Sequence, residues 1–261
     1  MAEEETITLI KRDFIRNLAK KGRRIDGRAF DDMRPITIET AVVSSAEGSA
    51  RVKIGKSDVL AGIKMSMGTP FPDTPDKGVM TTNAEMVPMA SPTFETGPPS
   101  QVSIEFARVV DRGIRESGCL PLESLCVKPG EKVWVIFIDM HVLDYDGNLF
   151  DTGSLAAVSA LKSTRVPAKS QDMGEDFPLT LGNLPISVTT VKIGDALMVD
   201  PGLDEERVAD ARLTVSSDEN HIVRAMQKGF TGAFKQQEVL DIVERAMAHG
   251  DEIRKKVIAI K

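Results

Sequence analysis

The apolar residues near the start of the chain recur at the spacing of a helix. We expect a helix over residues 3–22, because an apolar side chain returns there every three or four positions. The residues of this apolar stripe are Ile7, Ile10, Phe14 and Leu18, with Ile15 beside them. Acidic residues open the segment, two lysines close it, and Gly22 follows as a stop signal.

Beyond residue 36 the pattern changes to short runs that are typical of strands. The strand-like runs of the first half are residues 36–43, 50–55, 58–65, 84–90 and 131–143. A tight turn is expected at Lys56-Ser57, and the Pro- and Gly-containing segments 66–80 and 91–100 are typical of loops. Helical spacing returns over residues 101–117 and 154–164.

The second half repeats this order of strands followed by a helix. Its strand-like runs are residues 186–194, 195–200, 211–217 and 221–229, before a helix expected over residues 236–256. Gly and Pro within residues 179–185 indicate a seam, that is, a boundary between the two halves of the chain. The tetrapeptide VKIG occurs at residues 52–55 and again at 191–194. This weak sign of duplication favours a two-lobed α+β protein with mixed sheets.

Composition narrows the class of protein. A chain of 261 residues allows one large or two modest domains, and 41% apolar with 28% charged residues is ordinary for a soluble protein. The acidic start MAEEE is unlike a signal peptide, and the apolar run at residues 133–138 is too short to cross a bilayer. Cys119 and Cys126 are spaced unlike zinc ligands. With twelve methionines, they favour a reducing, cytoplasmic location without a disulfide framework.

The formal net charge of -6 bears on nucleic-acid binding. An acidic protein does not hold RNA or DNA with its whole surface, because the phosphates repel it. Any such binding therefore requires a local basic patch or the help of a partner.

The acidic segment at residues 144–153, DYDGNLFDTG, resembles a site because three carboxylates and an Asn fall within eight residues. An EF-hand calcium loop needs Gly at its sixth position, whereas Gly147 comes fourth here. Asp, Gly and Asn are also common turn residues, since they tolerate positive φ. We favour a plain turn and keep a metal- or ligand-binding α+β protein as an alternative.

Sequence motifs for other chemistry are absent. The chain has no G-x-S-x-G, no Walker A loop and no G-x-G-x-x-G, and its three histidines are scattered along the sequence. The carboxylates in DPGLDEERVAD, residues 200–210, have two interpretations. Paired acids can bind Mg²⁺ or act as acid and base, or they can be the acidic start of a helical turn.

The helical segment at residues 101–117 carries three arginines on one side. Arg108, Arg112 and Arg115 fall within about 60° of one another at helical spacing. The opposite face is the apolar set Val102, Phe106, Val109, Val110 and Gly113. A row of guanidinium groups can follow successive phosphates. Acids at i±4, Asp111 and Glu116, can instead neutralise this face, and from the pattern alone we favour that interpretation.

The order of these segments resembles that of RNase PH-like proteins along nearly the whole chain. The matching stretches are RRIDGRAFDDMRPI, SARVKIGKSDVLAGIKM, SIEFARVVDRGIRES, VWVIFIDMHVLDYDGNLFD with AAVSAL, and VDPGLDEE. Within this family the chain is most similar to the non-catalytic ring subunit of the exosome, of archaeal type. The resemblance implies two β-α-β-rich lobes like the second domain of ribosomal protein S5. We assign residues 1–22 to an N-terminal helix, 23–180 to domain 1 and 181–261 to domain 2.

The resemblance also implies an assembly. Three copies would alternate with three copies of a catalytic RNase PH-like sister subunit in a hexameric ring. The ring would degrade single-stranded RNA 3′→5′ by phosphorolysis, with RNA-binding cap proteins on one face and no membrane involvement. Inorganic phosphate, with Mg²⁺ as a further candidate, would act at the sister's site, and this chain would need no cofactor of its own.

Departures from the family pattern predict an inactive lobe. Active members hold phosphate with a Ser-Arg or Thr-Arg pair after the strong strand, and Leu149-Phe150 stand about there. The arginine pair before the RNA-contacting helix is replaced by Gln101-Val102. Asp200 and Glu206 match the family's acids, and a self-sufficient phosphorolytic exoribonuclease is therefore the main alternative.

The same resemblance changes the interpretation of the three-arginine helix. The equivalent helix faces the sister's active site, and Arg108 and Arg112 match residues expected to touch the RNA backbone. Arg115, on the same face, is included as a third RNA contact. We therefore expect no catalytic residues and no metal ligands in this chain, and an RNA contact through these arginines.

Overall fold

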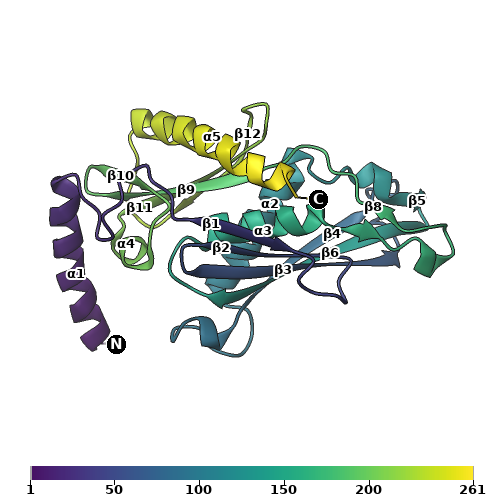
Figure 1. The fold of residues 1–261 in the computed structure, drawn as a ribbon, viewed down its shortest axis with the longest axis horizontal. Coiled ribbons are helices and arrows are strands. Elements are labelled where there is room, and N and C mark those ends of the chain that lie inside the picture. The colour runs from purple at the N-terminus through teal and green to yellow at the C-terminus, as the bar shows by residue number, and fades with distance from the viewer. Residues whose placement is uncertain (1, 261) are drawn as a thin grey trace.

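The fold consists of two main β-sheets with helices between and around them (Figure 1). The computed structural model describes residues 2–260, and the side chains of residues 11–260. The larger sheet has the strand order β1-β2-β3-β6-β4, with β5 pairing β6. Its strands are β1 Ile36–Thr40, β2 Gly48–Ile54, β3 Ser57–Gly68, β4 Val79–Met86, β5 Cys126–Lys128 and β6 Lys132–Asp144. The β4–β6 pair is parallel and the other pairs are antiparallel, which makes the sheet mixed.

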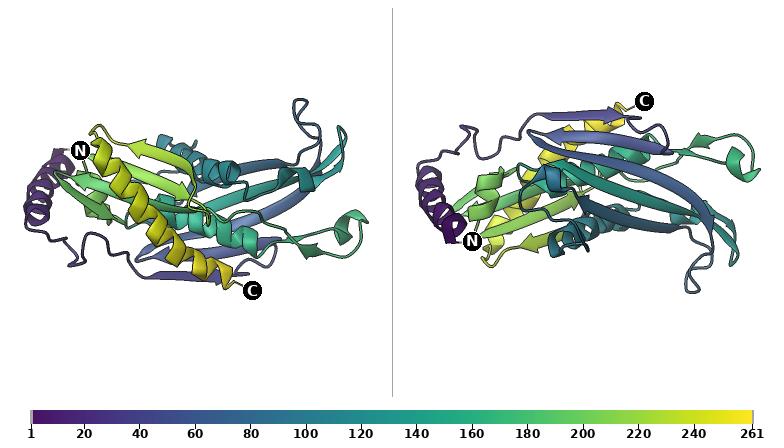
Figure 2. Two further views of the ribbon diagram at one scale, coloured as in Figure 1. Left: turned by 90° about the horizontal axis from the view of Figure 1, so that it is seen from above. Right: turned by 90° about the horizontal axis from the view of Figure 1, so that it is seen from below.

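The smaller sheet is antiparallel, with the order β10-β9-β11-β12. Its strands are β9 Ile186–Ile193, β10 Ala196–Val199, β11 Ala211–Ser217 and β12 Val223–Gly229. A third pair, β7 Arg165–Val166 with β8 Phe177–Pro178, lies on the excursion that leaves the body in Figure 2. The two main sheets fall on either side of residues 179–185, where the sequence indicates a seam. The predicted domain limits themselves stay a prediction.

Five α-helices complete the described residues. They are α1 Ala2–Lys20, α2 Gln101–Ser117, α3 Leu149–Lys162, α4 Leu203–Val208 and α5 Gln236–Ile258, with short 3₁₀ turns at Pro88–Ala90, Leu122–Leu125 and Lys169–Gln171. Helix α1 stands at one end of the molecule and α5 runs across the smaller sheet (Figure 1). Among these helices none is long and apolar enough to cross a membrane.

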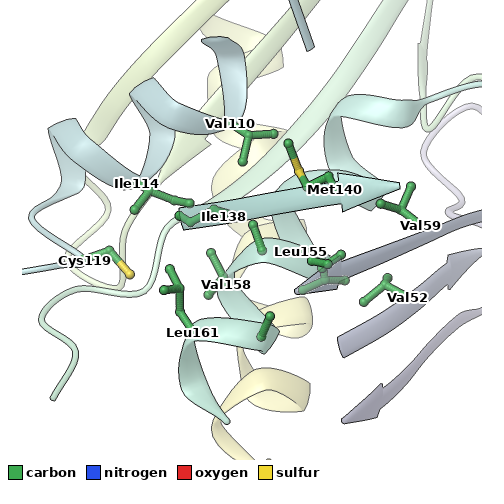
Figure 3. Close-up of a cluster of buried hydrophobic side chains, with 14 of the residues drawn as sticks. Val52, Val59, Val110, Ile114, Cys119, Ile138, Met140, Leu155, Val158 and Leu161 are labelled. Atoms are coloured by element: carbon green, nitrogen blue, oxygen red, sulfur yellow. The ribbon is translucent and has the colours of Figure 1, made fainter. Parts of the chain in front are cut away.

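Helix α3 lies at the centre of the core. Its residues from Leu149 to Leu161 are all buried, and the helix packs on β2, β3 and β9, so that it joins the two sheets. Small residues permit this close packing: a Cβ on Gly153 would lie 2.2 Å from the Phe106 ring of α2. Figure 3 shows Leu155 and Val158 of α3 gathered with Val110 of α2 and Ile138 of β6. Burial of these side chains supplies the main favourable free energy of folding.

Most of the predicted elements are confirmed, including the helix at residues 101–117. Several details were wrong. The strand before the second loop is residues 79–86, not 84–90. The helix predicted from residue 154 begins at Leu149, which places Leu149 and Phe150 inside it. Phe14, assigned to the apolar stripe of α1, is 54% exposed, whereas Ile15 and Ala19 pack on the smaller sheet. The side chains of Ile7 and Ile10 lie outside the described ones.

The VKIG repeat marks two equivalent hairpins. The pairs Ile54↔Ser57 and Ile193↔Ala196 each enclose a two-residue turn, one residue earlier than predicted in the first case. Each turn begins with a Gly of positive φ, 61° at Gly55 and 62° at Gly194, as the twist of a two-residue hairpin requires. Four shared residues therefore encode the same local structure in both sheets.

Candidate functional site

Helix α2 presents the candidate arginines on its outer side. The helix is capped at its start by Ser100, whose hydroxyl accepts a hydrogen bond from the Ser103 amide at 3.2 Å, and at its end by Gly118 with φ 69°. The buried side chains of α2 include Phe106, Val110 and Ile114, so the apolar stripe predicted from the sequence faces the core, although Val102 is 56% exposed. Arg108 and Arg112 lie on the exposed side.

A groove runs between α2 and β12. It has a volume of about 310 Å³ and is lined by Gln101, Ile104, Glu105, Arg108, Val109, Arg112 and Gln227. The lining contains two guanidinium groups, two amides and one carboxylate, and no aromatic ring. Such a surface suits hydrogen bonding to phosphate oxygens better than stacking on bases.

The three arginines of α2 do not form one row of free cations. Arg108 and Arg112 both line the groove, and no ion pair is found for either among the described side chains. Arg115 pairs with Asp111 at 3.0 Å, one helical turn away, and donates to the Met80 carbonyl. It faces a different hollow, lined also by Phe71 and Lys77. The neutralisation expected from the sequence pattern therefore occurs at Arg115 and not at the other two.

The acidic segment at residues 144–153 forms a tight turn that packs against the backbone of Pro201 and Gly202. Gly147 has φ 86°, and a Cβ there would come within 2.6 Å of the Gly202 backbone. Asn148 follows with φ 56° and is fully buried. Only Gly tolerates this contact together with this φ. The segment therefore serves the joint between the two sheets, in agreement with the turn interpretation.

Phe150 occupies the space between α2, α3 and β11. It is 4% exposed, and its ring centroid lies 6.2 Å from that of Phe106. The guanidinium of Arg212, on β11, lies over the Phe150 ring at 4.2 Å from its centroid. Leu149 is also buried, at 6% exposed. Neither side chain carries a hydrogen-bond donor that could hold an anion.

Asp200 is committed to a buried ion pair. Arg34 donates to its two carboxylate oxygens at 2.7 and 2.9 Å, Arg28 donates at 3.1 Å, and Asn148 donates at 2.7 Å. Burial opposes ionisation, but the hydrogen bonds from Arg34 and Asn148 outweigh it and hold the pKa of Asp200 below its ordinary value. This carboxylate is ionised and has its oxygens occupied.

Glu206 is occupied in a similar way. It accepts from Arg212 at 3.0 Å, from the Asn148 amide at 3.1 Å and from the Tyr145 hydroxyl at 3.2 Å. Burial, together with the neighbouring Glu206, raises the pKa of Tyr145, so that its hydroxyl remains a donor. Both acids that the sequence singles out at residues 200–210 are therefore brought to the acidic turn, as partners of arginines and amides.

Asp151 is the buried carboxylate of this region that has no cationic partner among the described side chains. It accepts from the Thr189 hydroxyl at 2.7 Å, from the Thr189 amide at 2.8 Å and from Asn148 at 2.8 Å. Burial raises the pKa of Asp151 to about 7. In the part of the chain that the structure describes, no three His, Cys, Asp or Glu side chains are placed to hold a metal ion.

Two residues of this region escaped the sequence interpretation, Arg212 and Gln227. Arg212 donates to Glu105 of α2 at 3.0 Å as well as to Glu206, and Gln227 of β12 donates to Glu105 at 3.2 Å. The available signal was an arginine in an otherwise apolar or hydroxyl-bearing strand, ARLTVSS. A charged residue in such a run is buried only when it is paired, which makes it a marker of a specific contact.

Comparison with known families gives two matches. Residues 32–167 match domain 1 of the 3′ exoribonuclease family, and residues 183–249 match domain 2. Among curated proteins, the chain is 52% identical to the exosome complex component Rrp42 of Methanocella arvoryzae, over 99% of each chain. It is also 52% identical to the Rrp42 of Pyrococcus abyssi, over 99% of this chain and 97% of that one.

Solved structures agree with these matches. A chain of the Archaeoglobus fulgidus exosome with RNA bound to the active site is 46% identical, with a TM-score of 0.94 over 96% of this chain and 99% of that chain. A chain of an archaeal exosome core is 42% identical, with a TM-score of 0.90 over 98% of this chain and 99% of that one. Rice Rrp46, at 20% identity and a TM-score of 0.71, shares the fold.

Proposed function

The chain belongs to the 3′ exoribonuclease family, and from that premise we propose that it is a non-catalytic ring subunit of an exosome that degrades RNA 3′→5′. The relatives named Rrp42 support the assignment to an exosome, since each matches over almost its full length. The proposal has two parts: this chain carries no phosphorolytic site, and it contacts RNA beside the site of a sister subunit.

The first part rests chiefly on Phe150. A phosphate nucleophile needs hydroxyl, amide and guanidinium donors around it. At Leu149-Phe150 the chain instead places two buried apolar side chains, and Arg212 covers the Phe150 ring. Asp200 and Glu206 could serve as acids only if their arginine partners were released, which would leave buried charges unpaired. Phosphate, and Mg²⁺ if it is used, would act at the sister's site.

The second part rests on the groove between α2 and β12. Arg108 and Arg112 are exposed there and are not neutralised by a described partner, so they can contact the RNA backbone. Arg115 can join them only if its pair with Asp111 opens. In this proposal the groove supplies the local basic patch that a chain of net charge -6 needs in order to hold RNA.

The proposed partners follow from the family assignment. They are a catalytic RNase PH-like sister subunit that alternates with this chain as a trimer of heterodimers, RNA-binding cap proteins and single-stranded RNA. The proposed location is the cytoplasm.

Reconstitution tests the two parts separately. The chain alone, given labelled RNA and excess inorganic phosphate, is expected to release no nucleoside diphosphate, whereas the mixture with the sister is expected to form a six-subunit ring and degrade the RNA. Release by the chain alone would overturn the non-catalytic assignment in favour of a self-sufficient exoribonuclease. Heat on titration with Ca²⁺ or Mg²⁺ would instead favour a metal-binding role.

Charge reversal tests the RNA contact. In the reconstituted ring, R108E/R112E is expected to weaken RNA binding at least tenfold and to slow decay, because two phosphate contacts become repulsive. The control K20E/K21E makes the same change of net charge at two exposed lysines where the distant helix α1 ends, and it is expected to bind as the wild type does. Equal affinity of all three rings would remove the groove from the proposal.

A further inference from the structure

The three acidic side chains of α2 differ in their ion-pair partners. This difference explains why two of the three arginines of the helix have no ion pair with a described side chain. Asp111 is bound to Arg115 on the same helix. Glu116 is exposed at the far end of the helix. Glu105 is the acid inside the groove, and it lies three residues before Arg108, a spacing at which helical side chains pair. Glu105 is nevertheless bound to another element.

Two side chains of the smaller sheet hold Glu105. Arg212 of β11 donates to its Oε1 at 3.0 Å, and Gln227 of β12 donates to the same oxygen at 3.2 Å. Arg212 is only 8% exposed at its side chain, so this ion pair is screened far less by solvent than a surface pair between Glu105 and Arg108 would be. Competition for Glu105 therefore favours Arg212.

The surroundings of Arg212 are arranged to keep it in this position. Its guanidinium lies between two rings, 4.2 Å from the Phe150 centroid and 4.9 Å from the Phe230 centroid. Glu206 holds its other terminal nitrogen at 3.0 Å. Gly229, its cross-strand neighbour on β12, leaves the necessary room, since a Cβ there would lie 2.9 Å from Arg212 Nη2.

From these contacts we propose that Arg212 and Gln227 are positioning residues for RNA binding: they hold the Glu105 carboxylate away from Arg108 and so keep the groove cationic. Neither residue needs to touch RNA in this role. The inference rests on the proposed function, since it assumes that Arg108 and Arg112 contact RNA phosphates. It adds that the affinity of the groove is set by a contact between α2 and the second sheet.

The test measures RNA affinity of the reconstituted ring as a function of salt. R212Q releases Glu105, which then pairs with Arg108 and repels phosphate. The loss of one phosphate contact on a single strand reduces the steepness of log affinity against log salt by about 0.7. Near 0.1 M salt this corresponds to about a fivefold loss of affinity. We expect R212Q to show this loss and R212Q/E105Q to regain the wild-type affinity and slope. E105Q alone is expected to bind at least as tightly as the wild type.

The rescue distinguishes this role from a merely structural one. R212Q also leaves Glu206 without its cation, but E105Q cannot repair that defect. An assembled R212Q/E105Q ring that binds as weakly as R212Q would therefore overturn the inference, as would an R212Q ring with wild-type affinity. If R212Q does not assemble, Q227L decides: a loss smaller than fivefold that E105Q reverses is expected, and no loss would overturn the inference.

The outcome for R108E/R112E separates this inference from the proposed function. If that variant binds RNA as the wild type does, the groove is not an RNA site and both proposals fail. If R108E/R112E loses affinity while E105Q does not restore the affinity of R212Q, only the positioning role of Arg212 and Gln227 fails.

Discussion

The guanidinium of Arg212 lies 4.2 Å from the centroid of the Phe150 ring, so an arginine and an aromatic side chain fill the position at which we propose that phosphate donors are missing. The arginine comes from β11 and the ring from α3, and their contact therefore also fastens the second sheet to the central helix. The same two residues therefore carry both the proposed loss of phosphate chemistry and the packing of the second sheet on α3.

The ion pairs of Asp200 and Glu206 predict that new phosphate donors at residues 149–150 are not sufficient for activity. We expect the chain with L149S/F150R to release no nucleoside diphosphate from RNA and phosphate, because Asp200 and Glu206 remain bound to Arg34 and Arg212. Activity of this variant without the sister would contradict the assignment of both acids to structural pairs.

Truncation of Phe150 measures its packing. F150A is expected to lower the free energy of unfolding by about 3–5 kcal/mol, the usual cost of removing a buried aromatic side chain. V102A, at a position 56% exposed on α2, is expected to cost less than about 0.5 kcal/mol. Denaturant unfolding of the two variants gives the comparison, and similar values for both would contradict the buried role of Phe150.

The Arg34–Asp200 pair predicts a large stability loss on breaking. R34M leaves Asp200, which is 0% exposed, without its main cationic partner, and about 3–5 kcal/mol is expected to be lost. K128M removes a pair with Glu131 whose side chains are both 63% exposed, and it is expected to change stability by less than about 1 kcal/mol. A small effect of R34M in denaturant unfolding would mean that Arg28 and Asn148 suffice for Asp200.

The sequence predicted most elements because their signals are local. Helix α2 has an apolar stripe whose helical spacing placed its ends correctly, and the structure shows a cap at Ser100 and a left-handed Gly118 at those ends. The start of α3 was missed because Gly147 and Asn148 have positive φ and the side chain of Asn148, the N-cap residue, makes no capping hydrogen bond. Nothing within residues 144–153 reveals that Pro201 and Gly202 lie against this turn.

The candidate site was predictable in its parts but not in its pairing. Spacing along α2 identified the three arginines and two acids near them, Asp111 and Glu116, but it did not show which pairs form and it missed Glu105. The choice depends on Arg212 and Gln227, which lie more than 100 positions from Glu105 along the chain. Partners so distant in sequence leave no periodic signal, and only the folded chain brings them to α2.

The pKa of Asp151, raised by burial to about 7, predicts a pH dependence of stability. In the unfolded chain an Asp ionises near pH 4, so between about pH 4 and 7 the folded state binds more protons than the unfolded state. The contribution of Asp151 is therefore fully present below about pH 4 and is lost as the pH rises toward 7. We expect the free energy of unfolding of the wild type, relative to D151N, to fall by about 2–4 kcal/mol over this range.

Denaturant unfolding at several pH values checks this difference. D144N, at an exposed Asp at the end of β6, is the control and is expected to follow the wild type. A constant difference between the wild type and D151N from pH 4 to 7 would show that the folded state keeps Asp151 ionised.

The different pairing of the α2 arginines predicts different effects on RNA binding. R108Q and R112Q are each expected to weaken RNA binding of the reconstituted ring about fivefold near 0.1 M salt, since each removes one contact to a single strand. R115Q is expected to weaken it less than about twofold, because Arg115 is already neutralised by Asp111 at 3.0 Å and faces another hollow. D111N frees Arg115 from this pair. In the D111N background, R115Q is therefore expected to weaken RNA binding more than it does in the wild type. Equal losses for the three single variants would show that RNA reaches beyond the groove and opens the Asp111 pair.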